Sequence, residues 1–138
     1  MTFSFKGLDH VQITAPLGSE TETRRFFTEI LGCEEIEKPE TLKHFESIWF
    51  DIGNHILHVG FDGNFHAEKR GHPAFEMTNI AELMNRLKEY AIPFEEDHNL
   101  PGARRFYTNA FFGHRMEFLE WQNKPEAMMT VVEKLSTE

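Results

Sequence analysis

The chain has 138 residues, which is enough for one domain with a hydrophobic core and too few for two ordinary domains. Its net charge of −9 argues against nucleic acid and anionic membrane surfaces as partners, because both require clustered lysine and arginine. The single cysteine, Cys33, leaves no disulfide framework and no thiolate metal cluster. No basic-then-apolar leader and no membrane-length apolar run occur, so we expect a cytoplasmic protein.

The first half of the sequence predicts the order strand, helix, strand, strand, strand. Residues 8–14 alternate between apolar and polar residues, as a strand does, with His10 on the polar side. Ser19 and Glu22 have the spacing of a capping box for a helix over 19–31, which Gly32 ends. Three short strands are then predicted, over 34–37, 46–52 and 55–60.

The same order begins again after a polar linker over 63–71. A strand is predicted over 72–77, and Asn79 is expected to cap a helix that runs to about residue 91. Three more strands follow, at 94–97, 104–108 and 115–119. The two helix starts, Ser19 and Asn79, are 60 residues apart, which indicates a two-copy repeat.

The repeat predicts an α+β fold with two βαβββ modules, at about 7–62 and 71–121, in one domain that covers residues 1–123. Residues 124–138 form a C-terminal tail, in which an amphipathic helix is expected to pack on the domain or on a partner chain.

Equivalent places in the two modules hold side chains that bind metals. His10 and His72 lie in the first strands, and His58 and Glu117 lie in the last. Period-two alternation points each of them away from the face that packs on the helices. Taken singly, a strand histidine is usually structural and a strand glutamate usually exposed. The joint pattern favours a metal site in a cup formed by the outer faces of the sheets.

The motifs His10-Val-Gln-Ile, Leu57-His58-Val-Gly, Gly71-His72-Pro-Ala-Phe and Arg105-Phe-Tyr…Gly113-His-Arg-Met-Glu117 resemble those of the vicinal-oxygen-chelate superfamily. This superfamily includes glyoxalase I, extradiol dioxygenases, fosfomycin-resistance transferases, methylmalonyl-CoA epimerase and bleomycin-binding proteins. The resemblance implies a glyoxalase-like fold, with a mixed curved sheet around a metal-binding cup.

Residue by residue, the resemblance implies that His10, His72 and Glu117 form a metal triad. His58 occupies the place of a fourth ligand that is usually glutamate. Tyr107 and Gln12 are expected to line the substrate cavity. Two departures are visible, because the fourth position is histidine and the turn before the last strand has lost its usual Asp-Pro-x-Gly sequence.

The sequence also carries two adjacent arginines, Arg104 and Arg105, and only one of them can face the cup. We assign substrate binding to Arg105, which could hold an anionic group of the substrate. A solvated pair beside a loop is the alternative interpretation.

The leading hypothesis is a divalent-metal-dependent lyase or isomerase of glyoxalase type that acts on a small oxygen-chelating substrate. Glu117 would be both ligand and proton shuttle, and mixed nitrogen and oxygen ligation suits Zn, Ni, Fe(II), Mn or Co. The alternatives are an extradiol-type dioxygenase, a fosfomycin-resistance-like transferase and a non-catalytic drug-binding protein. Relatives often build such cups across a dimer interface, so a homodimer is a further expectation from the resemblance.

Overall fold

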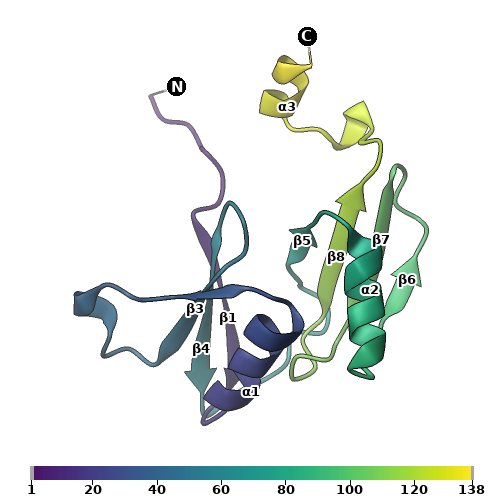
Figure 1. Cartoon of the computed structure of the whole chain (residues 1–138). Helices are drawn as coiled ribbons and strands as arrows, with labels where there is room; N and C mark the ends of the chain where they lie inside the picture. The colour runs from purple at the N-terminus through teal and green to yellow at the C-terminus, as the bar shows by residue number, and fades with distance from the viewer. Residues whose placement is uncertain (1, 138) are drawn as a thin grey trace. The chain divides into compact units, whose positions relative to one another are not determined.

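The computed structural model describes residues 2–137. The chain divides after His66 into two compact units, and each unit has its own sheet and its own helix (Figure 1). Each sheet has four strands and mixes one parallel pair with antiparallel pairs. This confirms the predicted α+β class.

The first unit contains the sheet β1-β4-β3-β2. Its strands are β1 (His10–Pro16), β2 (Glu34–Ile36), β3 (Ser47–Asp51) and β4 (Ile56–Asp62). Between β1 and β2, α1 (Glu20–Arg24) continues directly into the π-helix η1 (Arg25–Ile30), and the 3-10 turn η2 (Glu40–Leu42) precedes β3. Strand β1 is parallel to β4, its neighbour in the sheet. The helix between β1 and β2 provides the crossover connection that a parallel pair requires.

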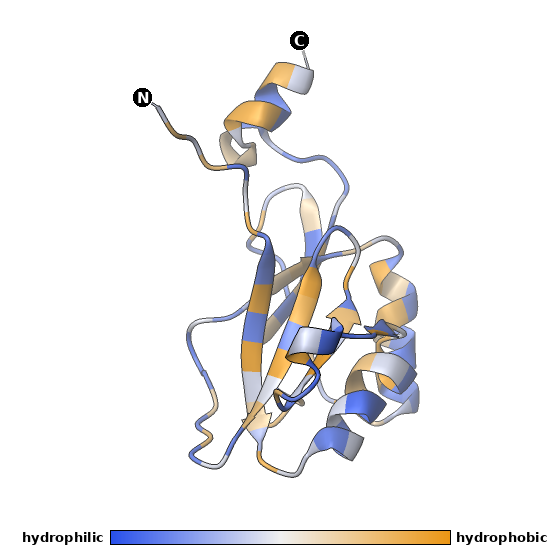
Figure 2. Ribbon diagram, turned by 90° about the vertical axis from the view of Figure 1, so that its left-hand side faces the viewer, coloured by the Kyte–Doolittle hydropathy of each residue, from blue (hydrophilic) through white to orange (hydrophobic). Residues whose placement is uncertain are grey.

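The core of the first unit lies on one face of its sheet. Hydrophobic and hydrophilic residues alternate along β1, which places every second side chain on the apolar face (Figure 2). Phe27 of η1 stacks on Phe50 of β3 with ring centroids 4.9 Å apart, and Leu57 and Val59 of β4 are fully buried. The opposite face of the same strands is therefore free for His10, Gln12 and His58.

The second unit contains the sheet β5-β8-β7-β6. Its strands are β5 (Ala74–Glu76), β6 (Glu95–Asp97), β7 (Ala103–Thr108) and β8 (Met116–Trp121), with α2 (Ile80–Glu89) between β5 and β6. The buried residues of α2 recur at spacings of three and four, which gives the helix one apolar face. Phe106 and Phe118 stack on the same side of the sheet with centroids 5.1 Å apart. The structure thus repeats the strand and helix order of the first unit.

Both helix starts were located correctly, but the predicted capping interactions were wrong. Ser19 is the N-cap of α1, yet its hydroxyl donates to the Pro16 carbonyl and caps no helix N–H. Asn79 is the N-cap of α2 in a left-handed conformation, and its amide bonds Glu82. The carboxylate of Glu120 in β8 accepts from the backbone N–H groups of Asn79 and Ile80, at 2.8 and 3.1 Å. A tertiary contact has taken over the role of the local cap.

The tail forms two short helical segments, the 3-10 turn η3 (Glu126–Met128) and α3 (Val131–Ser136). Thr130 and Glu133 form a capping box at the start of α3. The side chains of Val131, Val132 and Leu135 are 74, 75 and 65% exposed. The predicted packing of this apolar face on the domain is therefore wrong for the single chain.

Across residues 2–137, no helix has the length and apolar character needed to cross a membrane.

Candidate functional site

The open face of the first unit brings three of the predicted site residues together. In the β1–β4 pairing Gln12 lies opposite His58, and in the β3–β4 pairing Trp49 lies opposite His58 on its other side. The His58 ring lies between two others. Its centroid is 4.0 Å from Trp49 at an interplanar angle of 4°, and 4.3 Å from His10 at 17°.

An open cavity of about 660 Å³ lies over this face. His10, Gln12, Trp49 and His58 line it. The remaining lining residues are Asp9, Leu42, Phe45, Ser47, Asn54, His55 and Ile56. The Gln12 amide lies over Gly60, where an added Cβ would come within 2.9 Å of Nε2. Because Gly60 has no side chain, the Gln12 side chain can occupy this part of the cavity wall.

The histidines of the first unit differ in their partners. The Nδ1 atom of His10 lies 2.9 Å from the carboxylate of Asp9, and this hydrogen bond lowers the pKa of the Asp9 carboxyl. With a proton on Nδ1, the Nε2 atom of His10 presents a lone pair. Burial, followed by repulsion from His10, lowers the pKa of His58, so that its ring is neutral at pH 7. Neutral imidazole is the form that binds metals.

In the second unit Glu117 is buried, with 6% of its surface exposed. The sequence left open whether this carboxylate is exposed on an edge or faces inward, and the structure excludes the exposed edge. Its Oε1 atom is 3.0 Å from Nε2 of His72, while Nδ1 of His72 is 2.9 Å from the Arg70 carbonyl. Because that carbonyl can only accept, Nδ1 carries a proton. Nε2 then either donates a second proton to the carboxylate or, without that proton, shares a cation with it.

Arg105 is held by two carboxylates on the same face. Its Nε and Nη2 atoms lie 3.1 and 3.0 Å from Oδ1 of Asp97, and Nη1 lies 3.4 Å from Oε2 of Glu117. A hydrogen bond from the Asn99 backbone and then the guanidinium of Arg105 lower the pKa of Asp97. The neighbouring Arg104 bonds Glu96 at 2.8 Å. The alternation predicted for the two arginines is confirmed, since only Arg105 contacts Glu117.

Tyr107 lies directly opposite Glu117 in the β7–β8 pairing. Its ring and that of His72 form a T-shaped contact with centroids 5.6 Å apart. The guanidinium of Arg105 is 5.4 Å from the Tyr107 centroid, and that of Arg115 is 4.0 Å from it. His72, Glu117, Arg105, Tyr107 and Arg115 therefore form one continuous cluster within the second unit.

The predicted metal ligands occur as one pair in each unit, His10 with His58 and His72 with Glu117. Over residues 2–137, no three histidine, cysteine, aspartate or glutamate side chains are grouped closely enough to hold a metal ion. The predicted ligand set therefore stays a prediction, as do the substrate contacts of Gln12, Tyr107 and Arg105.

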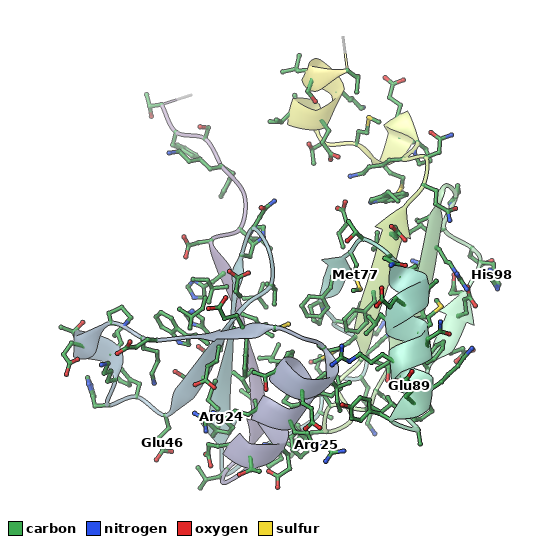
Figure 3. The ribbon with its side chains drawn as sticks, viewed as in Figure 1. Arg24, Arg25, Glu46, Met77, Glu89 and His98 are labelled. Carbon is green, nitrogen blue, oxygen red and sulfur yellow. The ribbon has the colours of Figure 1, made fainter. Side chains whose placement is uncertain are left out.

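The remaining histidines agree with their interpretation as surface or structural residues. His44, His55, His66 and His98 are exposed, and His98 lies in the loop after β6 (Figure 3). His114 is 6% exposed, and its Nδ1 atom accepts a hydrogen bond from the Glu68 backbone. His114 thus anchors a loop.

Sequence reasoning missed Trp49, Asp97 and Arg115. One signal was present for Trp49, because it stands opposite His58 as Tyr107 stands opposite Glu117. That equivalence depends on strand register, which alternation alone does not define.

Several solved structures are similar to this chain. A glyoxalase family protein from Bacillus anthracis is 44% identical, with a TM-score of 0.82 over 88% of this chain and 99% of that one. The E126Q mutant of the fosfomycin resistance protein FosX from Listeria monocytogenes, in a complex with Mn(II) and 1S,2S-dihydroxypropylphosphonic acid, is 20% identical, with a TM-score of 0.69 over 96% of this chain and 99% of that one. Lactoylglutathione lyase from Agrobacterium tumefaciens is 20% identical, with a TM-score of 0.64 over 83% and 93%.

No protein-family model and no curated protein matches the sequence. The fold, the repeated module and the 44% identity over nearly the whole of the Bacillus protein define the class. The chain belongs to the glyoxalase family of the vicinal-oxygen-chelate superfamily.

Proposed function

We propose that this protein is a divalent-metal-dependent lyase or isomerase of glyoxalase type that acts on a small substrate with two chelating oxygens. The His72–Glu117 pair carries the proposal. A buried carboxylate and an imidazole whose other nitrogen bonds a backbone carbonyl lie 3.0 Å apart. A carboxylate and an imidazole whose second nitrogen is fixed in this way are donors of the kind from which protein metal sites are built.

The proposed ligands are His10, His72 and Glu117, with His58 as a fourth. His10 supports the assignment because Asp9 occupies its Nδ1 and leaves Nε2 for the ion. His58 would have to leave its stack to ligate the same ion as His10. The two rings are stacked with centroids 4.3 Å apart at 17°, so their nitrogen lone pairs are not directed at one point.

The ion and the side chains of the protein would contribute different parts of the proposed chemistry. A divalent ion would supply a Lewis acid that polarises the substrate oxygens. Glu117 would take a proton from the carbon beside a carbonyl and return it to the neighbouring carbon. The bond to Arg105 orients its second oxygen. Gln12 and Tyr107 would line the substrate space. Mn(II) is the first ion to test, because the FosX structure holds it.

The test uses the hemithioacetal of methylglyoxal and glutathione as substrate in D₂O. Proton NMR follows isomerisation and deuterium uptake by the full chain, before and after loading with Mn(II), Ni(II) or Zn(II). We expect turnover only with an ion, and a loss of about a hundredfold or more in Glu117→Gln, the usual effect of removing a general base. If the metal-loaded wild-type protein showed no turnover, the glyoxalase assignment would be wrong. An unchanged rate in Glu117→Gln would remove the proton-transfer role.

The stacked position of His58 favours a second candidate. With His58 held between Trp49 and His10, the ligands that remain are His10, His72 and Glu117. The resemblance assigns this three-residue set to the dioxygenase and fosfomycin-resistance branches. Oxygen uptake by the Fe(II)-loaded protein with catechol tests the first of these, and loss of fosfomycin in the presence of the Mn(II)-loaded protein tests the second. Activity in either assay, with none on the hemithioacetal, would replace the leading proposal.

A further inference from the structure

The two arginines in the cluster around Glu117 have different partners. Arg105 is 18% exposed, and its Nε and both terminal nitrogens are occupied by Asp97 and Glu117. Binding a substrate anion would cost it at least one of these partners, and losing Glu117 would leave a buried carboxylate without its cation. Arg105 is therefore suited to hold Glu117 in place and poorly suited to hold a substrate.

Arg115 differs from Arg105 in its exposure and in its partners. It is exposed, and no carboxylate within residues 2–137 forms an ion pair with it. Its guanidinium lies 4.0 Å from the centroid of Tyr107. Contact with a ring face leaves the N–H groups at the edge of the guanidinium available, and these match the oxygens of a carboxylate or phosphate.

The backbone at Arg115 is also fixed in position. Its N–H donates to the Glu68 carbonyl at 2.9 Å, and the Glu68 N–H donates to Nδ1 of His114 at 2.9 Å. The Glu68 carboxylate is engaged by the N–H groups of Arg70 and Gly71. Arg115 is thus presented from a clamped backbone and rests on an aromatic ring, so little conformational entropy is lost when it binds a ligand.

Arg115 directly precedes β8 and is two residues before Glu117, a distance of about 7 Å in an extended chain. Its guanidinium lies over Tyr107, which stands directly opposite Glu117. A molecule held near Glu117 by two oxygens could place an anionic group at Arg115 if the two are separated by only a few bonds. We propose that Arg115 binds an anionic group of the substrate, a carboxylate or a phosphate-like group, and that Arg105 positions Glu117. The inference deepens the proposed metal-dependent function and rests on it.

The test compares three 2-hydroxy acids that share one chelating hydroxyl and carboxylate. Lactate carries no further anion, whereas malate and 2-hydroxyglutarate carry a second carboxylate one and two carbons further along. Their dissociation constants are measured by calorimetry on the Mn(II)-loaded full chain. We expect wild type to bind one of the dianions about ten- to a hundredfold more tightly than lactate, which is the gain in affinity expected from one charge-assisted hydrogen bond. Equal binding of all three would overturn the proposal.

The variants Arg115→Gln and Arg105→Gln separate the two roles. Arg115→Gln should lose the preference for the dianion and retain its Mn(II) affinity. Arg105→Gln should bind Mn(II) and all three ligands more weakly and retain the preference. Arg115→Lys should recover only part of the preference, because lysine keeps the charge without the planar fork. Thermal unfolding confirms that each variant folds. A dianion preference that survives Arg115→Gln would exclude Arg115 as the anion site.

A second arm separates failure of this inference from failure of the metal proposal. Inorganic phosphate is titrated into metal-free protein while NMR follows the ring protons of Tyr107. A shift in wild type that is absent in Arg115→Gln supports the anion site even if the protein binds no metal. No shift in wild type, or an equal shift in both proteins, contradicts it.

Discussion

Glu117 is oriented by Arg105, a side chain to which the sequence-based hypothesis assigned substrate binding. Arg105 bonds its second oxygen at 3.4 Å and is itself held by Asp97 at 3.0 Å. We expect Arg105→Gln to weaken Mn(II) binding about ten- to a hundredfold, the usual effect of losing a group that orients a metal ligand. Competition with a fluorescent chelator measures the affinity.

Arg104→Gln is the matched control, because Arg104 lies on the other side of the strand and bonds Glu96 at 2.8 Å. Its Mn(II) affinity should equal that of wild type. Equal affinities in both arginine variants would mean that Arg105 does not support Glu117.

Cys33 is the only cysteine, and burial raises the pKa of its thiol to about 11. At pH 8 its thiolate fraction should therefore be about two hundredfold below that of a free cysteine, and the rate of alkylation by iodoacetamide should fall in proportion. Mass spectrometry follows the reaction in native protein and in urea. A native rate equal to the unfolded rate would show that the thiol is neither buried nor shifted.

At the level of the elements, the start of α2 depends on a residue in another element. Glu120 of β8 accepts from two of the backbone N–H groups at that start. Glu120→Ala should lower the free energy of unfolding by about 1 kcal/mol, as loss of an N-cap does. Urea denaturation measures the change. Asn79→Gly is the control and should cost little, because Asn79 has φ 54° and its side chain caps nothing. A larger loss in Asn79→Gly than in Glu120→Ala would reverse this assignment.

The apolar face of α3 gives a second prediction for an element. Val131, Val132 and Leu135 are all more than half exposed. Changing the three together to serine should alter the free energy of unfolding by less than about 0.5 kcal/mol at low protein concentration, as is usual for surface positions. A loss above about 1 kcal/mol in urea denaturation would contradict the exposed position of α3.

Alternation and helical periodicity were enough to locate the strands and both main helices, because each has one apolar face. The capping interactions could not be predicted from the sequence. Ser19 and Asn79 carry side chains suited to capping, and a neighbouring carbonyl and the neighbouring carboxylate Glu82 bind them instead. The π-helical turn of η1 was missed for the same reason, since the bond from Leu31 to the Phe26 carbonyl has no marker in residue type.

For the molecule as a whole, the repeat predicted which side chains share a face, and the structure pairs them within each unit. Tyr107 and Glu117 are directly opposite each other, as are Trp49 and His58. The sequence could not show that His58 would be stacked between two rings, or that Arg105 would be saturated by two carboxylates. Both depend on strand register and on side-chain rotamers, which neither composition nor spacing defines.

We propose that His10 and the His72–Glu117 pair serve one metal ion. Metal content per chain, measured by elemental analysis after loading with Mn(II) and removal of free ion, tests it most directly in wild type, His10→Ala and Glu117→Ala. His44→Ala, at an exposed histidine, is the control. We expect one ion per chain in wild type and the control, and almost none in either site variant, because two protein ligands rarely hold a divalent ion. Full metal content in His10→Ala, with loss only in Glu117→Ala, would contradict it.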